Sequence, residues 1–186
     1  MTRVYPHTSF AVPVIETERL VLRAHLATDF EPYADLFASD RAGFMGRLTR
    51  RQAWYSFCSD VAQWALFGFG GWGLQDRATG AFVGQVAVMR PDHFPETEVG
   101  WFVLPEAEGR GLAYEAARAV RDWAFGPRGL ETLVSYIDPA NARSIRLAER
   151  LGAELDPGAT GAWPEDAVYR HPGPAALARS GMEVPA

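Results

Sequence analysis

The stretch Glu108-Gly109-Arg110-Gly111-Leu112-Ala113 joins a strand-like run to an amphipathic helical pattern at residues 114–125. Glycine at positions 109 and 111 allows a tight turn in which backbone N–H groups point toward one spot, and the start of a helix adds partial positive charge there. Such a turn can bind a pyrophosphate through main-chain groups. A plain strand-to-helix connection needs similar glycines, so the hexapeptide alone leaves both interpretations open.

The basic residues narrow the chemistry, because all 18 of them are arginine. Without lysine there is no Walker A loop, whose lysine contacts the phosphates, and no Schiff-base catalysis. A phosphate-binding loop in this chain therefore has to work through backbone N–H groups and arginine.

Length and composition favour one ordinary globular domain, since the chain has 186 residues of which 48% are hydrophobic. No apolar run is long enough to cross a membrane, and the N-terminal residues lack the apolar core of a signal peptide. Cys58 is the single cysteine, which is typical of a reducing compartment. We therefore expect a cytoplasmic protein without a membrane partner. The net charge of −5 argues against nucleic acid as a partner.

The hydrophobic periodicity predicts an ordered series of strands and helices. Capping boxes at residues 28–31 and 49–52 predict the starts of two helices, and Gly68 predicts the end of the second. Further helices are expected after Gly111 and from Asn141 to Gly152. Strands are expected at residues 19–23, 70–75, 81–89, 96–104, 133–137, 153–155 and 167–171.

This order predicts the fold class. A meander of antiparallel strands followed by helical crossovers implies an α+β protein with a central mixed, mostly antiparallel sheet of six to seven strands flanked by about four helices. Residues 17–171 would form the domain, residues 1–16 an N-terminal arm and residues 172–186 a C-terminal tail.

A second segment gives the glycine loop a more specific meaning. Its signature residues are Asn141, Ser144, Leu151 and Gly152. Together with Gly111 and Ala113, they resemble the acetyl-CoA site of the GNAT superfamily of acyl-CoA N-acyltransferases. Residues 17–23 are similar to the opening strand of its ribosomal-protein N-alpha-acetyltransferase-like branch. Glu108 departs from the pattern, which prefers Gln or Arg, so we expect its side chain to point to solvent.

The resemblance implies a GNAT-like fold, acetyl-CoA as cosubstrate, no metal and a set of cofactor-binding residues. Main-chain groups of Phe102, Val103 and Leu104 would polarise the thioester carbonyl and pair with pantetheine, with a bulge in that strand freeing an N–H. The pyrophosphate would lie on the loop formed by Gly109, Arg110, Gly111, Leu112 and Ala113. Asn141 would orient the cofactor, although an Asn before a helix also serves as an N-cap.

Acyl transfer to an amine requires a base for the amine, and Glu98 on the strand before the loop is the first candidate. An exposed Glu on a strand is the plainer interpretation, since Glu is mostly exposed. Glu96, Asp92 and His93 are alternative bases. For the acid that protonates the thiolate, the resemblance implies Ser144, with Tyr136 as its rival; a serine there could also simply cap or pack.

The combined interpretation is an N-acetyltransferase that moves an acetyl group from acetyl-CoA directly to a primary amine, either a protein N-terminal α-amine or a small-molecule amine. A homodimer is possible. One alternative is a non-catalytic acyl-CoA-binding sensor of the same fold. A dinucleotide-binding oxidoreductase is disfavoured, because Tyr114 stands where the third small residue of its loop would be and the preceding strands form a meander.

Overall fold

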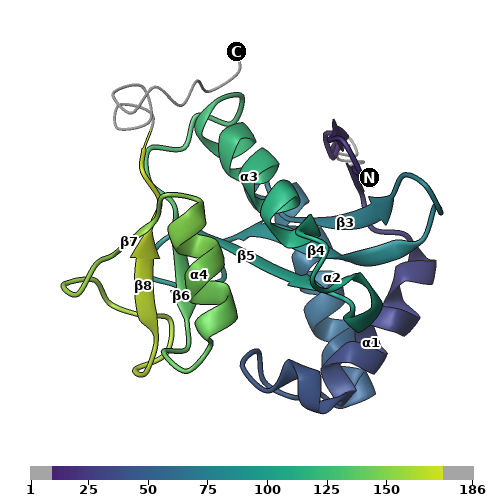
Figure 1. The fold of residues 1–186 in the computed structure, drawn as a ribbon, viewed down its shortest axis with the longest axis horizontal. Coiled ribbons are helices and arrows are strands. Elements are labelled where there is room, and N and C mark those ends of the chain that lie inside the picture. The colour runs from purple at the N-terminus through teal and green to yellow at the C-terminus, as the bar shows by residue number, and fades with distance from the viewer. Residues whose placement is uncertain (1–9, 174–186) are drawn as a thin grey trace, which may run out of the picture.

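The computed structural model describes residues 10–173, which form one eight-stranded sheet with four α-helices (Figure 1). The strands are β1 (Ile15–Glu16), β2 (Leu20–Arg23), β3 (Gly71–Asp76), β4 (Phe82–Met89), β5 (Glu98–Val103), β6 (Val134–Ile137), β7 (Glu154–Leu155) and β8 (Ala167–Arg170). Their order in the sheet is β1-β2-β3-β4-β5-β6-β8-β7. All neighbours are antiparallel except β5 and β6. The predicted mixed, mostly antiparallel α+β fold is confirmed, with one strand more than the upper expectation.

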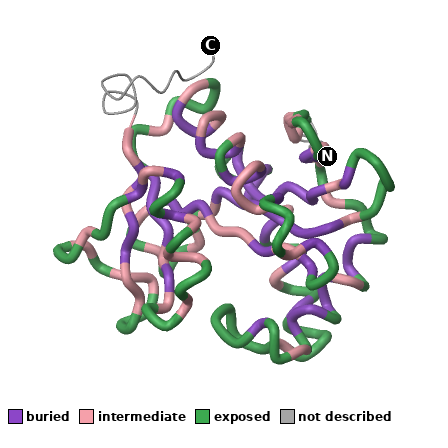
Figure 2. The backbone as a smooth tube through the Cα atoms, viewed as in Figure 1, coloured by how far each residue is buried: buried purple, intermediate pink, exposed green. Residues whose placement is uncertain are grey.

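The helices cover the two faces of this sheet. They are α1 (Phe30–Ala38), α2 (Arg50–Phe67), α3 (Leu112–Phe125) and α4 (Ala142–Arg150), with three short 3₁₀ turns, η1 (Ala27–Asp29), η2 (Asp40–Ala42) and η3 (Pro105–Ala107). One buried cluster joins α3 to side chains such as Val86 and Val99, and another joins α1 and α2 to Phe102. Side chains at odd and even positions of β5 thus pack into cores on opposite faces of the sheet, as strand alternation requires. Figure 2 shows buried residues along the central strands.

The two predicted capping boxes behave differently. In α2 the Thr49 N–H donates to Gln52 Oε1 at 2.9 Å, and Gly68 ends the helix in the left-handed conformation with φ of 69°. In α1 the expected cap at Thr28 was wrong, because residues 27–29 form η1. The Asp29 carboxylate is buried and accepts the Leu26 N–H at 2.9 Å, and it also pairs with Arg23. These contacts shift the helix start to Phe30.

The predicted arm and tail are described only in part. Residues 1–9 and 174–186 lie outside the described residues. The remainder of the arm extends the sheet, because Ile15 pairs with Leu22 in β2. The Trp72 indole also donates to the Pro13 carbonyl at 2.8 Å, so this segment packs on the domain.

The sheet divides at β5, which is the feature that positions the site. β4 and β5 stay paired from Met89↔Glu98 to Gly84↔Val103, whereas β5 and β6 pair only at Glu98↔Val134. Beyond that point the strands diverge (Figure 1). We call β1–β5 with α1–α3 the N-terminal part, and β6–β8 with α4 the C-terminal part.

The bulge expected in β5 was wrong. The irregularity in this region is a register shift between Leu74 and Gln75, where β3 meets β4. Opposite Val103, Gly84 adopts a φ of 153°, and a Cβ there would lie 2.4 Å from the Phe102 carbonyl oxygen. β5 itself keeps a continuous register with β4, so its free main-chain groups arise from the departure of β6.

Candidate active site

The glycine loop has the geometry of an anion cradle. Gly109 and Gly111 have φ of 72° and 77°, and Gly111 directly precedes the 14-residue helix α3. Among the described residues, the N–H groups from Gly109 to Tyr114 donate to no acceptor, and the first bond of the series is Glu115 N–H to the Gly111 carbonyl at 3.2 Å. A helix start leaves such donors free for a ligand, and its dipole favours an anion. The loop therefore fits a pyrophosphate through its main chain.

The side chain of Arg110, by contrast, turns to the protein. Its guanidinium pairs with the buried carboxylate of Asp76 at 2.8 Å, and its carbonyl accepts Arg19 Nη1 at 2.7 Å. Asp76 also accepts the Ala78 N–H at 2.9 Å. The backbone N–H of Arg110 stays free for a ligand, while Asp76 engages one nitrogen of its guanidinium.

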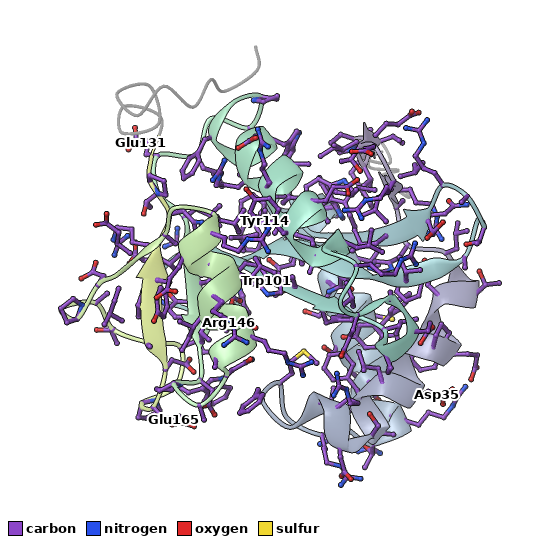
Figure 3. All side chains as sticks on the ribbon, viewed as in Figure 1. Asp35, Trp101, Tyr114, Glu131, Arg146 and Glu165 are labelled. Atoms are coloured by element: carbon purple, nitrogen blue, oxygen red, sulfur yellow. The ribbon has the colours of Figure 1, made fainter. Side chains whose placement is uncertain are left out.

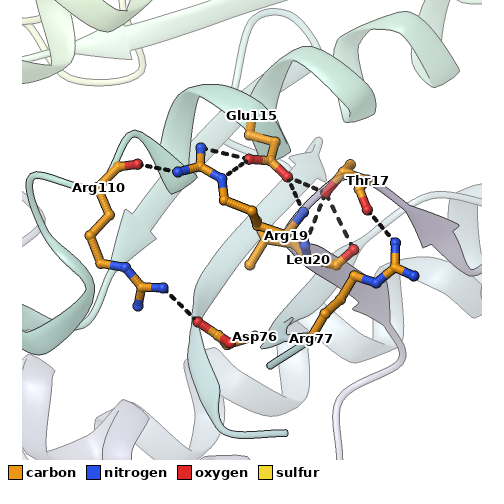
Figure 4. Close-up of polar contacts among 7 residues, drawn as sticks. All are labelled: Thr17, Arg19, Leu20, Asp76, Arg77, Arg110 and Glu115. Atoms are coloured by element: carbon orange, nitrogen blue, oxygen red, sulfur yellow. Dashed lines mark hydrogen bonds and ion pairs between the residues drawn. The ribbon is translucent and has the colours of Figure 1, made fainter. Parts of the chain in front are cut away.

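Side chains from the turn between β1 and β2 and from α3 hold the loop in place (Figure 4). The Glu115 carboxylate accepts Thr17 Oγ1 at 2.6 Å, Arg19 N at 2.8 Å and Arg19 Nε at 2.7 Å. Burial alone would raise the pKa of Glu115, but these hydrogen bonds outweigh it and hold that pKa below its usual value. Because Arg19 also holds the Arg110 carbonyl, this network fixes the turn before the helix.

Glu98 is buried at the point where β6 leaves β5. It is the first residue of β5, its side chain faces the same side as Gly100, and 8% of the residue is exposed. One carboxylate oxygen accepts the Tyr136 N–H at 3.3 Å. Burial, and then the nearby charges of Asp166 and Asp60, raise the pKa of Glu98 to about 8. An exposed strand glutamate, the plainer interpretation, is not what the structure contains.

The alternative bases have other surroundings. The Glu96 carboxylate is held by both terminal nitrogens of Arg170 at 2.8 Å, and hydrogen bonding from Arg170 lowers its pKa. Asp92 and His93 lie exposed in the turn before β5, where the His93 ring packs 4.8 Å from that of Phe94. Glu98 is the one of these four that is both buried and without an ion-pair partner among the described residues.

Where β6 departs, one edge of β5 is left without a strand partner, and we call this edge of β5 the opening. The main chain of β5 presents alternate residues to it. The Leu104 N–H already donates to the Val83 carbonyl at 2.9 Å, which assigns Leu104 and Phe102 to the β4 side. Val103 and Trp101 then face the side that β6 vacates. Consistently, the Val99 carbonyl accepts Ser135 Oγ from β6 at 2.6 Å. Of the predicted trio only Val103 faces the opening, and Trp101 was missed because the hairpin register is not visible in the sequence.

Asn141 caps the start of α4, as the sequence allowed. Asn141 Oδ1 accepts the Ser144 N–H at 3.2 Å, and the Ser144 hydroxyl has no hydrogen-bond partner among the described residues. The rival acid, Tyr136, has its hydroxyl engaged with the Glu96 backbone: its oxygen accepts the Glu96 N–H at 2.9 Å, and its O–H donates to the Glu96 carbonyl at 3.5 Å. Burial raises the pKa of Tyr136. The structure thus leaves the Ser144 hydroxyl available and occupies that of Tyr136.

The expectation that Glu108 points to solvent was wrong. Its two carboxylate oxygens form ion pairs with Arg41 of η2 and Arg143 of α4. Sequence reasoning missed both arginines, which lie 67 and 35 residues away along the chain. No pattern in the sequence around Glu108 predicts partners this far along the chain.

Aromatic and cationic side chains follow the line of separation between the two parts. Trp101, Tyr114 and Arg146 lie along it in Figure 3. The Trp101 side chain packs against the main core and also against the small cluster of the C-terminal part. The guanidinium of Arg150 lies over the Tyr114 ring at 4.3 Å. These contacts connect α3 and β5 to α4 where the strands no longer do.

The described part of the chain contains neither a group of side chains suited to a metal ion nor a helix suited to crossing a membrane. Residues 10–173 bring together no group of three His, Cys, Asp or Glu side chains that could hold a metal ion. Within the same residues, no helix has both the length and the apolar character needed to cross a membrane.

Comparison with known proteins gives the family. Residues 19–154 match the family described as the acetyltransferase (GNAT) domain. A crystal structure of the acetyltransferase from Agrobacterium tumefaciens str. C58 is 42% identical, with a TM-score of 0.85 over 92% of this chain and 99% of that one.

Two proteins of Bacillus subtilis (strain 168) are also similar. YkkB is 36% identical over 88 residues, which cover 46% of this chain, and the match spans about half (51%) of YkkB itself. The N-acetyltransferase YoaA is 25% identical over 151 residues, or 77% of this chain and 84% of YoaA. The chain therefore belongs to the GNAT acetyltransferase family and is an acyl-CoA-dependent N-acetyltransferase with acetyl-CoA as its cosubstrate.

Proposed function

We propose that this protein acetylates a primary amine, a small-molecule amine or a protein N-terminal α-amine, by direct transfer with Glu98 as the general base. The observation that carries the proposal is the placement of Glu98, a buried carboxylate without an ion-pair partner among the described residues, at the point where β5 and β6 separate. Its pKa of about 8 suits proton removal from an amine near neutral pH.

The roles of the other groups follow from where they lie. Acetyl-CoA supplies the activated acetyl thioester. The free N–H groups of the loop would hold its pyrophosphate, and the main chain of Trp101 and Val103 would pair with its pantetheine amides as a strand does. As the C–N bond forms and the C–S bond breaks, Glu98 takes the proton of the attacking amine, and the Ser144 hydroxyl hydrogen-bonds to the departing thiolate and relays to it a proton from solvent.

The charges near Glu98 favour a cationic acceptor. Asp166 forms no ion pair with any described residue, and burial, with the nearby charges of Glu165 and Asp138, raises its pKa. Asp166 is close enough to raise the pKa of Glu98 as well. An ammonium group approaching Glu98 would relieve this repulsion, so we infer that the acceptor arrives protonated and is attracted by these carboxylates.

The test is an acetylation screen over small amines and N-terminal peptides with wild-type protein and Glu98→Gln, and with Glu154→Gln as an exposed control. We expect turnover of at least one amine, lost by about 10²-fold or more in Glu98→Gln and kept in Glu154→Gln. Acetyl-CoA binding without turnover of any amine would contradict the proposal and favour the acyl-CoA sensor.

Two finer expectations stay predictions. A cytoplasmic location is supported by the single Cys58. A homodimer is to be tested by light scattering.

A further inference from the structure

Three charged side chains meet beside the glycine loop, and their arrangement points beyond the main-chain cradle. We propose that Arg41 and Arg143 are phosphate ligands of acetyl-CoA, and that Glu108 holds both guanidinium groups in place until the phosphates displace its carboxylate. This inference rests on the proposed binding of acetyl-CoA at the loop.

The three residues come from separate elements and converge at one place. Glu108 ends η3 and directly precedes Gly109, the first residue with a free N–H. Its Oε2 lies 2.9 Å from Arg143 Nη1, and its Oε1 contacts Arg41. Each carboxylate oxygen therefore receives one guanidinium, and the pair of arginines is already gathered at the edge of the anion cradle.

The charge balance favours exchange. One carboxylate neutralises one of two guanidinium charges, so an excess positive charge stays beside a helix start that itself favours anions. Phosphate groups carry more charge and more acceptor oxygens than a carboxylate, and arginine binds them in a two-pronged geometry. A phosphate at this place can therefore engage both arginines and the backbone donors together.

Other arginines near the loop are held more firmly. Arg110 pairs with Asp76, whose side chain is 4% exposed and also accepts backbone N–H groups. The contrast lies in the carboxylate: the Glu108 side chain is 31% exposed, whereas the arginines are similarly exposed, 40% for Arg41, 59% for Arg143 and 47% for Arg110. Exposed ion pairs contribute little stability and are readily exchanged. The side chains free to move toward a ligand are thus those held by Glu108.

The arginines also belong to the two parts that separate at β5. Arg41 comes from η2 in the N-terminal part, and Arg143 from α4 in the C-terminal part. A phosphate bound by both would connect the parts where β5 and β6 no longer pair. Glu108 makes that connection in the absence of a phosphate.

The experiment measures affinity by calorimetry for CoA, dephospho-CoA and pantetheine, without turnover. The variants are Arg41→Gln, Arg143→Gln and Glu108→Gln, with Arg47→Gln as the matched control, since Arg47 follows η2 and pairs with the exposed Asp40. We expect each of Arg41→Gln and Arg143→Gln to weaken CoA binding by about tenfold and to flatten its salt dependence. Pantetheine affinity should stay unchanged in all variants, and Arg143→Lys should recover part of the loss.

The Glu108→Gln variant tests whether the Glu108 carboxylate competes with a phosphate for the two arginines. Because its removal frees both arginines, we expect CoA to bind several-fold more tightly to this variant. Dephospho-CoA then identifies the phosphate: an equal loss with both ligands assigns the pyrophosphate, and a loss confined to CoA assigns the 3′-phosphate. The proposal is overturned if both arginine variants bind CoA as the wild type does, or if Glu108→Gln binds it more weakly. A wild type that binds no CoA would instead reject the proposed function.

Discussion

β5 has two edges, and it uses them differently. Toward β4 it is paired from Glu98 to Val103 without interruption, whereas toward β6 it is paired at Glu98 alone. The first edge makes the sheet continuous and the core rigid. The second leaves main-chain groups of Trp101 and Val103 and the carboxylate of Glu98 beside an opening. The contrast shows that the site is made by ending a strand pair early, and its residues are found by asking which groups thereby lose a partner.

The largest effect on ligand binding is expected at the glycine loop, residues 109–113. Gly111→Val should abolish CoA binding, because valine is strained at φ of 77° and its branches would crowd the free N–H groups. Gly129→Val is the matched control, since Gly129 has φ of 69° and open space around it. Equal loss of melting temperature in both variants, with CoA-induced stabilisation lost only at position 111, would support the account. A Gly111→Val protein that CoA still stabilises would show that the loop is merely a connection.

Proline substitution tests the two edges of β5 separately, because each proline removes one backbone N–H. Val103→Pro should fold and lose turnover by about 10²-fold, since its N–H faces the opening and a lost carbonyl donor has about this effect. Phe102→Pro should fail to fold stably, because its N–H belongs to the ladder with β4. Circular dichroism and turnover per folded molecule distinguish the cases. If Val103→Pro unfolds like Phe102→Pro, our assignment of the edges is wrong.

A smaller effect is expected at the start of α4. Ser144→Ala should lower turnover by less than about tenfold, because a thiolate of pKa near 8.5 departs without much assistance. Asn141→Ala should instead cost about 1 kcal/mol of folding free energy as a lost cap. Thermal melts and single-turnover rates measure the two defects separately. Reduced stability with normal turnover in both variants would mean that this segment is only a capped helix.

The smallest effect is expected on the pH dependence of the melting temperature. The pKa of Glu98 is raised to about 8 from an ordinary value of 4.5, so the folded state binds this proton more tightly than the unfolded state does. Its contribution is fully present below pH 4.5 and is lost as pH rises through 8. Glu98→Gln, which cannot ionise, should therefore melt a few degrees above the wild type at pH 9 and near it at pH 5. A difference that does not change with pH would place Glu98 in a solvated environment.

The sequence predicted those features that local patterns determine. The box at Thr49 and the glycine at 68 bounded α2, and the glycines at 109 and 111 marked the turn before α3, because caps and left-handed turns depend on a few adjacent residues. The order of elements led to the correct fold class for the same reason.

Features that depend on distant pairing were missed. Which of Trp101 and Phe102 faces the opening follows from the register with β4, and the partners of Glu108 lie on η2 and α4. The burial of Glu98 likewise depends on surrounding elements, and strand alternation alone could not distinguish it from an exposed glutamate. A single sequence contains no signal for such contacts.

The central claim is that Glu98, buried where β6 leaves β5, is the base. The most direct measurement is kcat/KM against pH, from 6 to 9.5, for wild type and Glu98→Gln with the same amine, so that titration of the amine is common to both curves. The account predicts that the ratio of wild type to variant rises about tenfold per pH unit and levels off near pH 8, as the carboxylate ionises. A ratio that stays below about threefold and flat across this range would contradict it.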